Sequence, residues 1–208
     1  MITLDVAINT GITYRVARTL GFVFGPPLMP LLVVALAAAS SETQLDPLNI
    51  VMFLGFMAFF PALFVYIAYR KGYVSDLGMS DRKQRHLTAI AALLMGILGV
   101  GMLILRHAEA SLIALAAGIC VQLVVLELLT LQDKVSYHSA GTSGLAVAAL
   151  FLVGISTGVT LLAVALATGW SRWYLGKHSM RQVILGLASS TALVFWFGVV
   201  SARLGLLP

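Results

Sequence analysis

Apolar stretches long enough to cross a membrane alternate with short polar segments along the chain. A transmembrane helix needs about 20 mainly apolar residues. The pattern predicts such helices over residues 20–39, 48–69, 87–105, 110–131 and 182–204. We interpret residues 142–170 as two short antiparallel helices that meet at the turn-like segment 154–158, although one long tilted helix fits that length almost as well. The chain is therefore predicted to be an all-α, polytopic transmembrane bundle of six or seven spans.

The N-terminal part of this pattern is irregular. Three prolines fall in the first half of the span 20–39, which is expected to be kinked or irregular. Residues 1–19 include two arginines and an aspartate, and we predict a short amphipathic or interfacial segment there. We expect a single membrane domain over residues 1–208, which divides into N-terminal spans (1–69), a core with the polar segments (70–186) and a last span (187–208).

The composition excludes several classes of protein. The chain has 208 residues, of which 60% are hydrophobic and 10% charged, whereas soluble domains contain about 25% charged residues. This shortage excludes a soluble globular protein, a disordered chain and a nucleic-acid-binding domain, despite the net charge of +5. The single cysteine, Cys120, can form neither an internal disulfide nor a thiolate metal cluster.

Three polar segments separate the spans: the first covers residues 70–86, the second 132–139 and the third 171–181. Two spans separate the first segment from the second, and two short helices separate the second from the third. All three segments are therefore predicted to emerge on one face of the membrane, where they can build a shared site. They contain most of the basic and histidine residues of the loops, namely Arg82, Lys83, Arg85, His86, Lys134, His138, Arg172, Lys177 and His178.

These residue types point to an anion site without a metal. Arginine guanidinium groups bind phosphate oxygens in a bidentate manner, and histidine acts near neutral pH as a nucleophile or a proton donor. A di-metal hydrolase needs several carboxylate or histidine ligands, which the loops do not offer. No metal and no other cofactor is therefore expected.

The spacing within two of the segments resembles signatures of the type 2 phosphatidic acid phosphatase superfamily. The sequence that begins at Ser171 reads Ser-Arg-x5-His-x3-Gln, and the third signature of the family is Ser-Arg-x5-His-x3-Asp. Residues 135–138 read Val-Ser-Tyr-His, which matches the second signature, Pro-Ser-Gly-His, at the serine and the histidine. The resemblance covers about residues 76–186, and the order and spacing suit small bacterial members of the family.

The first signature of that family, Lys-x6-Arg-Pro, is only partly present. Arg85-His86 stands where Arg-Pro is expected, but the residue seven positions before Arg85 is Gly78. Arg82 is our first choice to replace the family lysine, with Lys83 and Lys134 as alternatives.

The third signature departs from the family at Gln182, where other members have an aspartate that accepts the Nδ1 proton of the nucleophilic histidine. Residues 178 and 182 are i,i+4 neighbours, so the amide carbonyl of Gln182 can reach the same nitrogen and orient His178. The amide lacks the negative charge of the carboxylate, so its electrostatic support for the ring is expected to be weaker.

The resemblance implies a metal-independent lipid phosphatase with a phosphohistidine intermediate. His178 is then the nucleophile that attacks phosphorus, and His138 protonates the leaving lipid oxygen and afterwards activates water. The phosphoryl oxygens are held by basic and hydroxyl side chains, for which the candidates are Arg172, Arg85, Arg82, Ser136, Lys83 and Lys134. The substrate classes that the family implies are polyprenyl phosphates or diphosphates and phosphatidate-like lipids.

Two other functions stay open at this point. The first is a non-catalytic protein that binds or transports lipid phosphates. In that case the site has lost its activity through the amide at Gln182 and the absence of the family lysine. A third reading is phosphoryl transfer to an acceptor other than water. The partners expected in every case are a lipid phosphate and membrane lipids, with no prediction of an oligomeric state.

The distribution of basic residues predicts that the site faces the cytoplasm. The face with the polar segments has 11 of the 13 lysines and arginines, and only Arg106 and Arg203 lie on the other face. Many bacterial members of the family are thought to work on the outer face, so the resemblance and the charge bias disagree. The membrane is expected to be the inner membrane of a bacterial or archaeal cell. We interpret Glu127, inside the span 110–131, as structural, and His86 and His107 as solvated loop residues.

Overall fold

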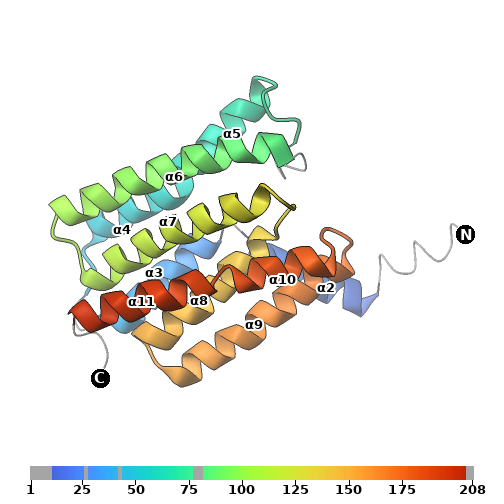
Figure 1. Ribbon diagram of the computed structural model, residues 1–208. Helices are drawn as coiled ribbons and strands as arrows, with labels where there is room; N and C mark the ends of the chain where they lie inside the picture. Colours follow the sequence, from blue (N-terminus) through green and yellow to red (C-terminus); the bar gives the residue numbers. More distant parts are fainter. Residues whose placement is uncertain (1–10, 26–27, 42–43, 77–81, 205–208) are drawn as a thin grey trace, which may run out of the picture.

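The computed structural model describes residues 11–25, 28–41, 44–76 and 82–204, without the side chains of residues 82, 83 and 204 (Figure 1). The described residues form helices joined by short loops, and no strand occurs among them, which confirms the predicted all-α class. The elements are α2 (Ile12–Val23), α3 (Met29–Ser40), α4 (Pro47–Leu54), the π-helical turn η1 (Gly55–Phe59), α5 (Phe60–Arg70), α6 (Arg82–Leu105), α7 (Ala110–Thr130), α8 (Tyr137–Leu152), α9 (Ile155–Tyr174), α10 (Met180–Ala188) and α11 (Thr191–Leu204).

Four helical stretches are long and apolar enough to cross a membrane, which is compatible with an integral membrane protein. They are Pro47–Arg70, Gln84–Leu105, Ala110–Thr130 and Met180–Arg203. The first joins α4, η1 and α5, and the last joins α10 and α11. These stretches agree with four of the predicted spans, whereas a total of six or seven is not confirmed.

The predicted span 20–39 is broken into two helices. α2 ends at Val23 and α3 begins at Met29, and each has 12 residues. Pro30 lies in the first turn of α3, where its missing N–H has no intrahelical partner to lose. The other two prolines of this region, Pro26 and Pro27, lie outside the described residues, as do residues 1–10 of the predicted interfacial segment. α2 packs against α9, whereas α3 packs against α7 and α8.

The long helix of α4 and α5 contains the π-helical turn because of Pro61. Proline has no N–H to donate, and its ring clashes with the carbonyl four residues earlier, which is that of Met57 in the centre of η1. A wider turn relieves that clash without ending the helix.

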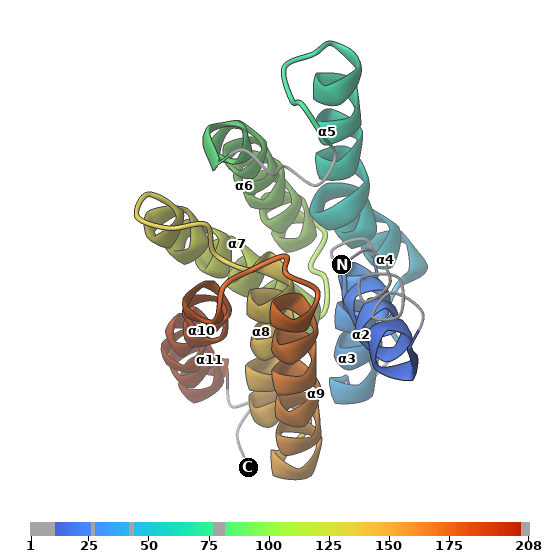
Figure 2. The ribbon, with the colours of Figure 1, turned by 90° about the vertical axis from the view of Figure 1, so that its right-hand side faces the viewer.

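The segment 142–170 forms two helices, as the preferred interpretation predicted. α8 and α9 run antiparallel and meet at Gly154, whose φ of 136° is accessible to glycine but strained for other residues (Figure 2). Both helices extend further than expected, since α8 begins at Tyr137 and α9 ends at Tyr174. A Cβ atom on Gly158 would lie 2.8 Å from the Cα atom of Leu150, so the two backbones are in close contact.

We expect Gly158→Ala to destabilise the protein, because the added methyl group must push α9 away from the backbone of α8. The expected loss is about 1–3 kcal/mol in the free energy of unfolding. Gly101→Ala is the matched control, since a Cβ atom on Gly101 meets no atom within 4 Å; it should stabilise α6 by up to about 1 kcal/mol. Unfolding in detergent measures both, and equal stability of the two variants would contradict the close contact.

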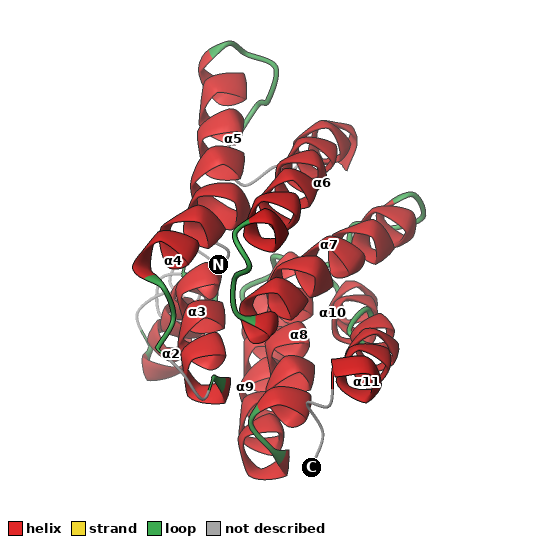
Figure 3. Cartoon of the chain, turned by 90° about the vertical axis from the view of Figure 1, so that its left-hand side faces the viewer, coloured by secondary structure: helices red, strands yellow, loops and turns green. Residues whose placement is uncertain are grey.

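The helices are arranged around α7 and α8. Figures 2 and 3 show α4, α5 and α6 on one side of α7, and the α8–α9 pair on the other side, with α10 and α11 beside α8. The three polar segments approach the same end of the bundle, at the right of Figure 1. This end holds the start of α6, the α7–α8 loop and the α9–α10 loop.

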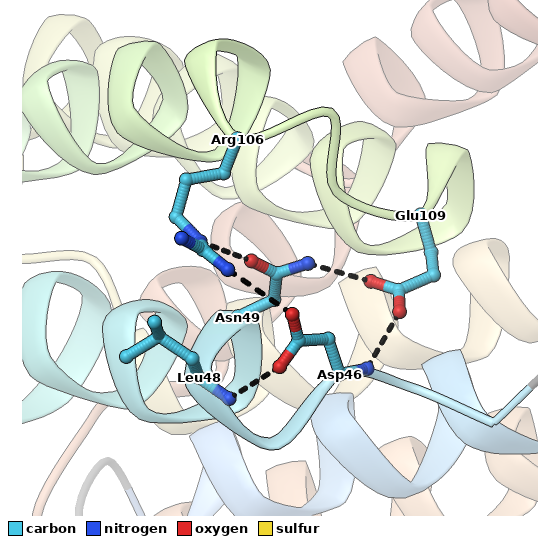
Figure 4. A network of polar contacts seen from close by, with 5 residues as sticks. All are labelled: Asp46, Leu48, Asn49, Arg106 and Glu109. Carbon is cyan, nitrogen blue, oxygen red and sulfur yellow. Dashed lines mark hydrogen bonds and ion pairs between the residues drawn. The ribbon is translucent and has the colours of Figure 1, made fainter.

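A polar network holds the opposite end of the bundle together (Figure 4). Arg106 pairs with Asp46 at 3.1 Å and donates from Nε to the Asn49 side chain at 2.9 Å. Glu109 accepts from the backbone N–H of Asp46 at 2.7 Å and from Asn49 Nδ2 at 3.3 Å. These contacts attach the start of α4 to the turn between α6 and α7.

Candidate functional site

Direct hydrogen bonds at one end of the bundle join the first polar segment to the second, and the second to Gln182, which directly follows the third. Arg85, near the start of α6, is buried and donates from Nη1 to the carbonyl of Val135 at 2.9 Å. The backbone N–H of Ser136 donates to the carbonyl of Gln182 at 3.2 Å. The structure therefore places Arg85, Ser136 and Gln182 together, although they come from distant parts of the sequence.

Glu127 connects three helices beside this site. Its carboxylate accepts a hydrogen bond from the Tyr137 hydroxyl at 2.6 Å and lies 2.6 Å from Nδ1 of His86. The guanidinium of Arg85 lies over the Tyr137 ring, 5.0 Å from its centre. The interpretation of His86 as a solvated loop residue is wrong, because α6 begins at Arg82 and turns His86 toward α7.

Ser136 and His138 lie where α8 begins. Ser136 is the N-cap of that helix: its fully buried hydroxyl oxygen accepts from the backbone N–H of Ser139 at 3.4 Å and from the Ser139 hydroxyl at 2.9 Å. The His138 ring lies close to the backbone of Gly21, and a Cβ atom on Gly25 would lie 3.4 Å from its Nε2 atom. The ring is also within electrostatic range of Arg85, Arg172 and His178. The first turn of α8 thus presents His138 between α2 and the basic residues.

Arg172 lies in the last turn of α9, against a glycine of α2. A Cβ atom on Gly21 would lie only 2.7 Å from its Nη1, so α2 makes room for the guanidinium by having no side chain there. Its Nε atom is buried and has no hydrogen-bond partner in the part of the chain that the structure describes. An unpaired buried donor of this kind is costly, and an anionic ligand would satisfy it.

His178 lies in the loop between α9 and α10 and contacts Gln182 as the i,i+4 spacing predicted. The distance from His178 Nδ1 to Gln182 Oε1 is 3.2 Å. Gln182 also forms a capping box with Ser179 at the start of α10, so its side chain is held by the helix end. Its Nε2 atom donates to Asp133 Oδ1 at 2.9 Å, a contact that the sequence analysis did not foresee.

The surroundings of His178 keep its ring neutral. Burial lowers its pKa to about 4; the hydrogen bond that His178 donates to Gln182 opposes this, and the positive charges of Lys134, Arg85 and Arg172 reinforce it. Burial also lowers the pKa of Lys134, and the neighbouring charge of Arg85 lowers it further. A neutral imidazole has a free lone pair at neutral pH, which a nucleophile requires.

Replacing Lys134 is therefore expected to raise the pKa of His178, because a positive charge beside the ring is removed. NMR titration of the labelled histidines should show a His178 midpoint near pH 4 in the native protein and a higher midpoint in Lys134→Ala. The folded protein favours the neutral ring of His178. The resulting contribution to the free energy of unfolding is therefore fully present above pH 6.5 and is lost as the pH drops toward 4. Lys71→Ala serves as the control, and a midpoint near 6.5 in the native protein would refute the buried, electropositive site.

Of the remaining phosphate-binding candidates, Arg82, Lys83 and Lys134, the structure describes the side chain of Lys134 alone. The side chains of Arg82 and Lys83 lie outside the described part of the structure. Lys134 lowers the pKa of His178, and Arg85 lowers the pKa of Lys134, which places its ammonium group beside the site. Gly21 and Asp133 were missed by sequence reasoning, and only the position of Asp133, two residues before the second signature, offered a signal.

An apolar cavity of about 190 Å³ lies inside the bundle beside Tyr137. Along α8 it is lined by a stripe at i, i+4, i+7 and i+8, and the stripe consists of Tyr137, Gly141, Gly144 and Leu145. Met29 of α3 and Phe197 of α11 contribute to other walls. Tyr137 therefore borders both the cavity and the guanidinium of Arg85.

Within the described ranges, no group of three or more histidine, cysteine, aspartate or glutamate side chains is placed to hold a metal ion. Family models, curated proteins and solved structures were each compared with this chain, and none of them matches it.

Proposed function

We propose that the protein is an integral-membrane lipid phosphatase that works without a metal through a phosphohistidine intermediate. The observation that supports this best is the meeting of two histidines and two arginines, His138, His178, Arg85 and Arg172, at one end of the bundle. The buried, unpartnered Nε of Arg172 adds a donor that an anion can satisfy. The neutral state of His178 suits a nucleophile.

The proposed reaction has two steps. In the first, His138 is protonated beside the bound phosphate dianion. Nε2 of His178 attacks phosphorus, the P–N bond forms, and the bond from phosphorus to the lipid oxygen breaks while His138 gives that oxygen its proton and becomes neutral. In the second, His138 takes a proton from water, which attacks phosphorus and releases inorganic phosphate from His178. Arg172 and Arg85 stabilise the charge that spreads over the equatorial oxygens.

The surroundings of the site favour a lipid with a small headgroup. The site lies at the end of long apolar helices, and an apolar cavity adjoins Tyr137. The described loops are short, so they offer little surface to grip a large headgroup. We therefore propose a polyprenyl phosphate or diphosphate, or a phosphatidate-class lipid, as substrate. From the charge bias we propose that the site faces the cytoplasmic side of a bacterial or archaeal inner membrane.

The test is phosphate release by the purified protein in detergent with EDTA present. The substrates are undecaprenyl diphosphate, a shorter prenyl diphosphate, phosphatidate and phosphatidylglycerophosphate. We expect release from at least one of them, together with a ³²P-labelled protein species that is stable in alkali and labile in acid. Release that requires a metal would overturn the proposal. Saturable binding of these lipids without release would favour the alternative, a non-catalytic protein for lipid-phosphate binding or transport, which the amide at Gln182 also fits.

A further inference from the structure

We propose that Asp133 is a positioning residue of this site, which supplies through Gln182 the carboxylate that position 182 lacks. The inference rests on the proposed function. Asp133 Oδ1 accepts a hydrogen bond from Gln182 Nε2 at 2.9 Å, and Gln182 Oε1 lies 3.2 Å from Nδ1 of His178. Asp133, Gln182 and His178 thus form one hydrogen-bonded chain that ends on the nucleophile.

The chemistry of the amide gives this chain a direction. An ionised carboxylate only accepts hydrogen bonds, so the Gln182 atom that faces Asp133 must be its NH₂ group. At the other end of the amide, the backbone N–H of Ser179 donates to Oε1 at 3.3 Å, which requires an oxygen there. Both contacts fix the same orientation of the Gln182 side chain, with its carbonyl toward His178.

That orientation selects one tautomer of the imidazole. A carbonyl oxygen only accepts, so Nδ1 of His178 must carry the proton and Nε2 keeps its lone pair for phosphorus. Gln182 without Asp133 would be held at one end only and would favour this tautomer less strongly. Asp133 therefore acts on the reaction through Gln182, without touching the reacting atoms.

The carboxylate also provides negative charge when the ring becomes positive. Bond formation at Nε2 places a positive charge on the imidazole, which the Asp133 carboxylate stabilises by polarising the amide between them. Asp133 is itself held by the backbone N–H of Lys134 at 2.7 Å and by Arg181 Nε at 3.6 Å. Its position is thus determined by the α7–α8 loop and by the first turn of α10.

The test exchanges the amide and the carboxylate. Asp133→Asn keeps the size of the side chain and removes its charge, and we expect kcat to fall by about 10- to 100-fold with KM nearly unchanged. The double variant Asp133→Asn/Gln182→Asp restores one amide and one carboxylate with their places reversed, and its kcat should return to at least the native value. Arg203→Ala, in α11 at the other end of the bundle, is the control and should leave kcat unchanged.

Nitrogen NMR of His178 separates this inference from the proposed function. The native protein should show the tautomer with the proton on Nδ1, and Asp133→Asn should show a mixture of both tautomers. A single unchanged tautomer in Asp133→Asn overturns the inference even if the protein proves inactive. In an active protein that requires His178, full kcat in Asp133→Asn, or no recovery in the double variant, also overturns it. An inactive protein in which the tautomer responds to Asp133 leaves the positioning role standing and removes the phosphatase proposal alone.

Discussion

His178→Ala is expected to lower phosphate release by at least about 10⁴-fold, because the atom that forms the covalent bond to phosphorus is removed. Losses of this size or larger follow the removal of a nucleophile in other enzymes with covalent intermediates. The side chain lies in a loop and is partly exposed, so the variant should fold and unfold like the native protein. The measurement is initial-rate release of phosphate, with thermal unfolding recorded for each preparation.

His138→Ala distinguishes the two chemical steps. With a substrate whose leaving group needs no proton, this variant should still form the phosphohistidine at His178 but should release phosphate slowly, because water is not activated. The matched control is His107→Asn at the opposite end of the bundle, since His107 has a φ of 52° that asparagine tolerates.

If His178→Ala kept more than about 1% of the native rate, the covalent mechanism would be excluded.

Arg172→Ala is expected to lower kcat/KM by about 10³-fold. A single preorganised donor at a developing oxyanion contributes about 10²- to 10³-fold, and an arginine on a transferred phosphoryl group contributes more. Arg172→Lys should recover only part of the loss, because an ammonium group cannot form the paired contacts of a guanidinium. Arg203→Ala, in α11 at the other end, should leave kcat/KM unchanged.

Replacing Arg172 should lower activity but should not lower the stability of the ligand-free protein. The buried Nε of Arg172 has no partner within the described chain, so the ligand-free protein bears the cost of an unsatisfied donor. Arg172→Met removes that donor and fills similar space, and we expect its melting temperature to equal or exceed that of the native protein. A clear fall in melting temperature alongside the fall in activity would indicate that Arg172 mainly supports the fold.

Parts of the fold that depend on local sequence were predictable. Apolar length identified the four long helices, and the turn-like residues around Gly154 identified the end of α8 and the start of α9. The span 20–39 was predicted to be kinked or irregular in its first half because of its three prolines, and the structure divides it between α2 and α3. An apolar count cannot detect that interruption, which separates α2 from α3.

Within the site, contacts inside one helical turn were predictable and contacts between helices were not. The i,i+4 spacing of His178 and Gln182 gave their contact directly. The bond from Gln182 to Asp133 depends on how the α7–α8 loop packs against α10, and no periodicity in the sequence reports that. Gly21 belongs to the site through the absence of a side chain beside Arg172, which a search for chemical groups overlooks.

In the proposed membrane enzyme, the shortness of α8 would determine how deep in the bilayer the reaction takes place. α8 has 16 residues, which is about 24 Å of helix at 1.5 Å per residue, and the hydrocarbon core of a bilayer is about 30 Å thick. His138 lies in the first turn of α8, and Gly154 lies two residues beyond its last residue. If α8 crosses the bilayer, His138 and Gly154 cannot both reach the surfaces of an undeformed bilayer. Such a mismatch would be absorbed by a local thinning of the bilayer, by a turn that stops inside the hydrocarbon, or by a phosphate group drawn below its neighbours. Under the proposed function, the length of α8 would thus set the depth at which a lipid headgroup meets water.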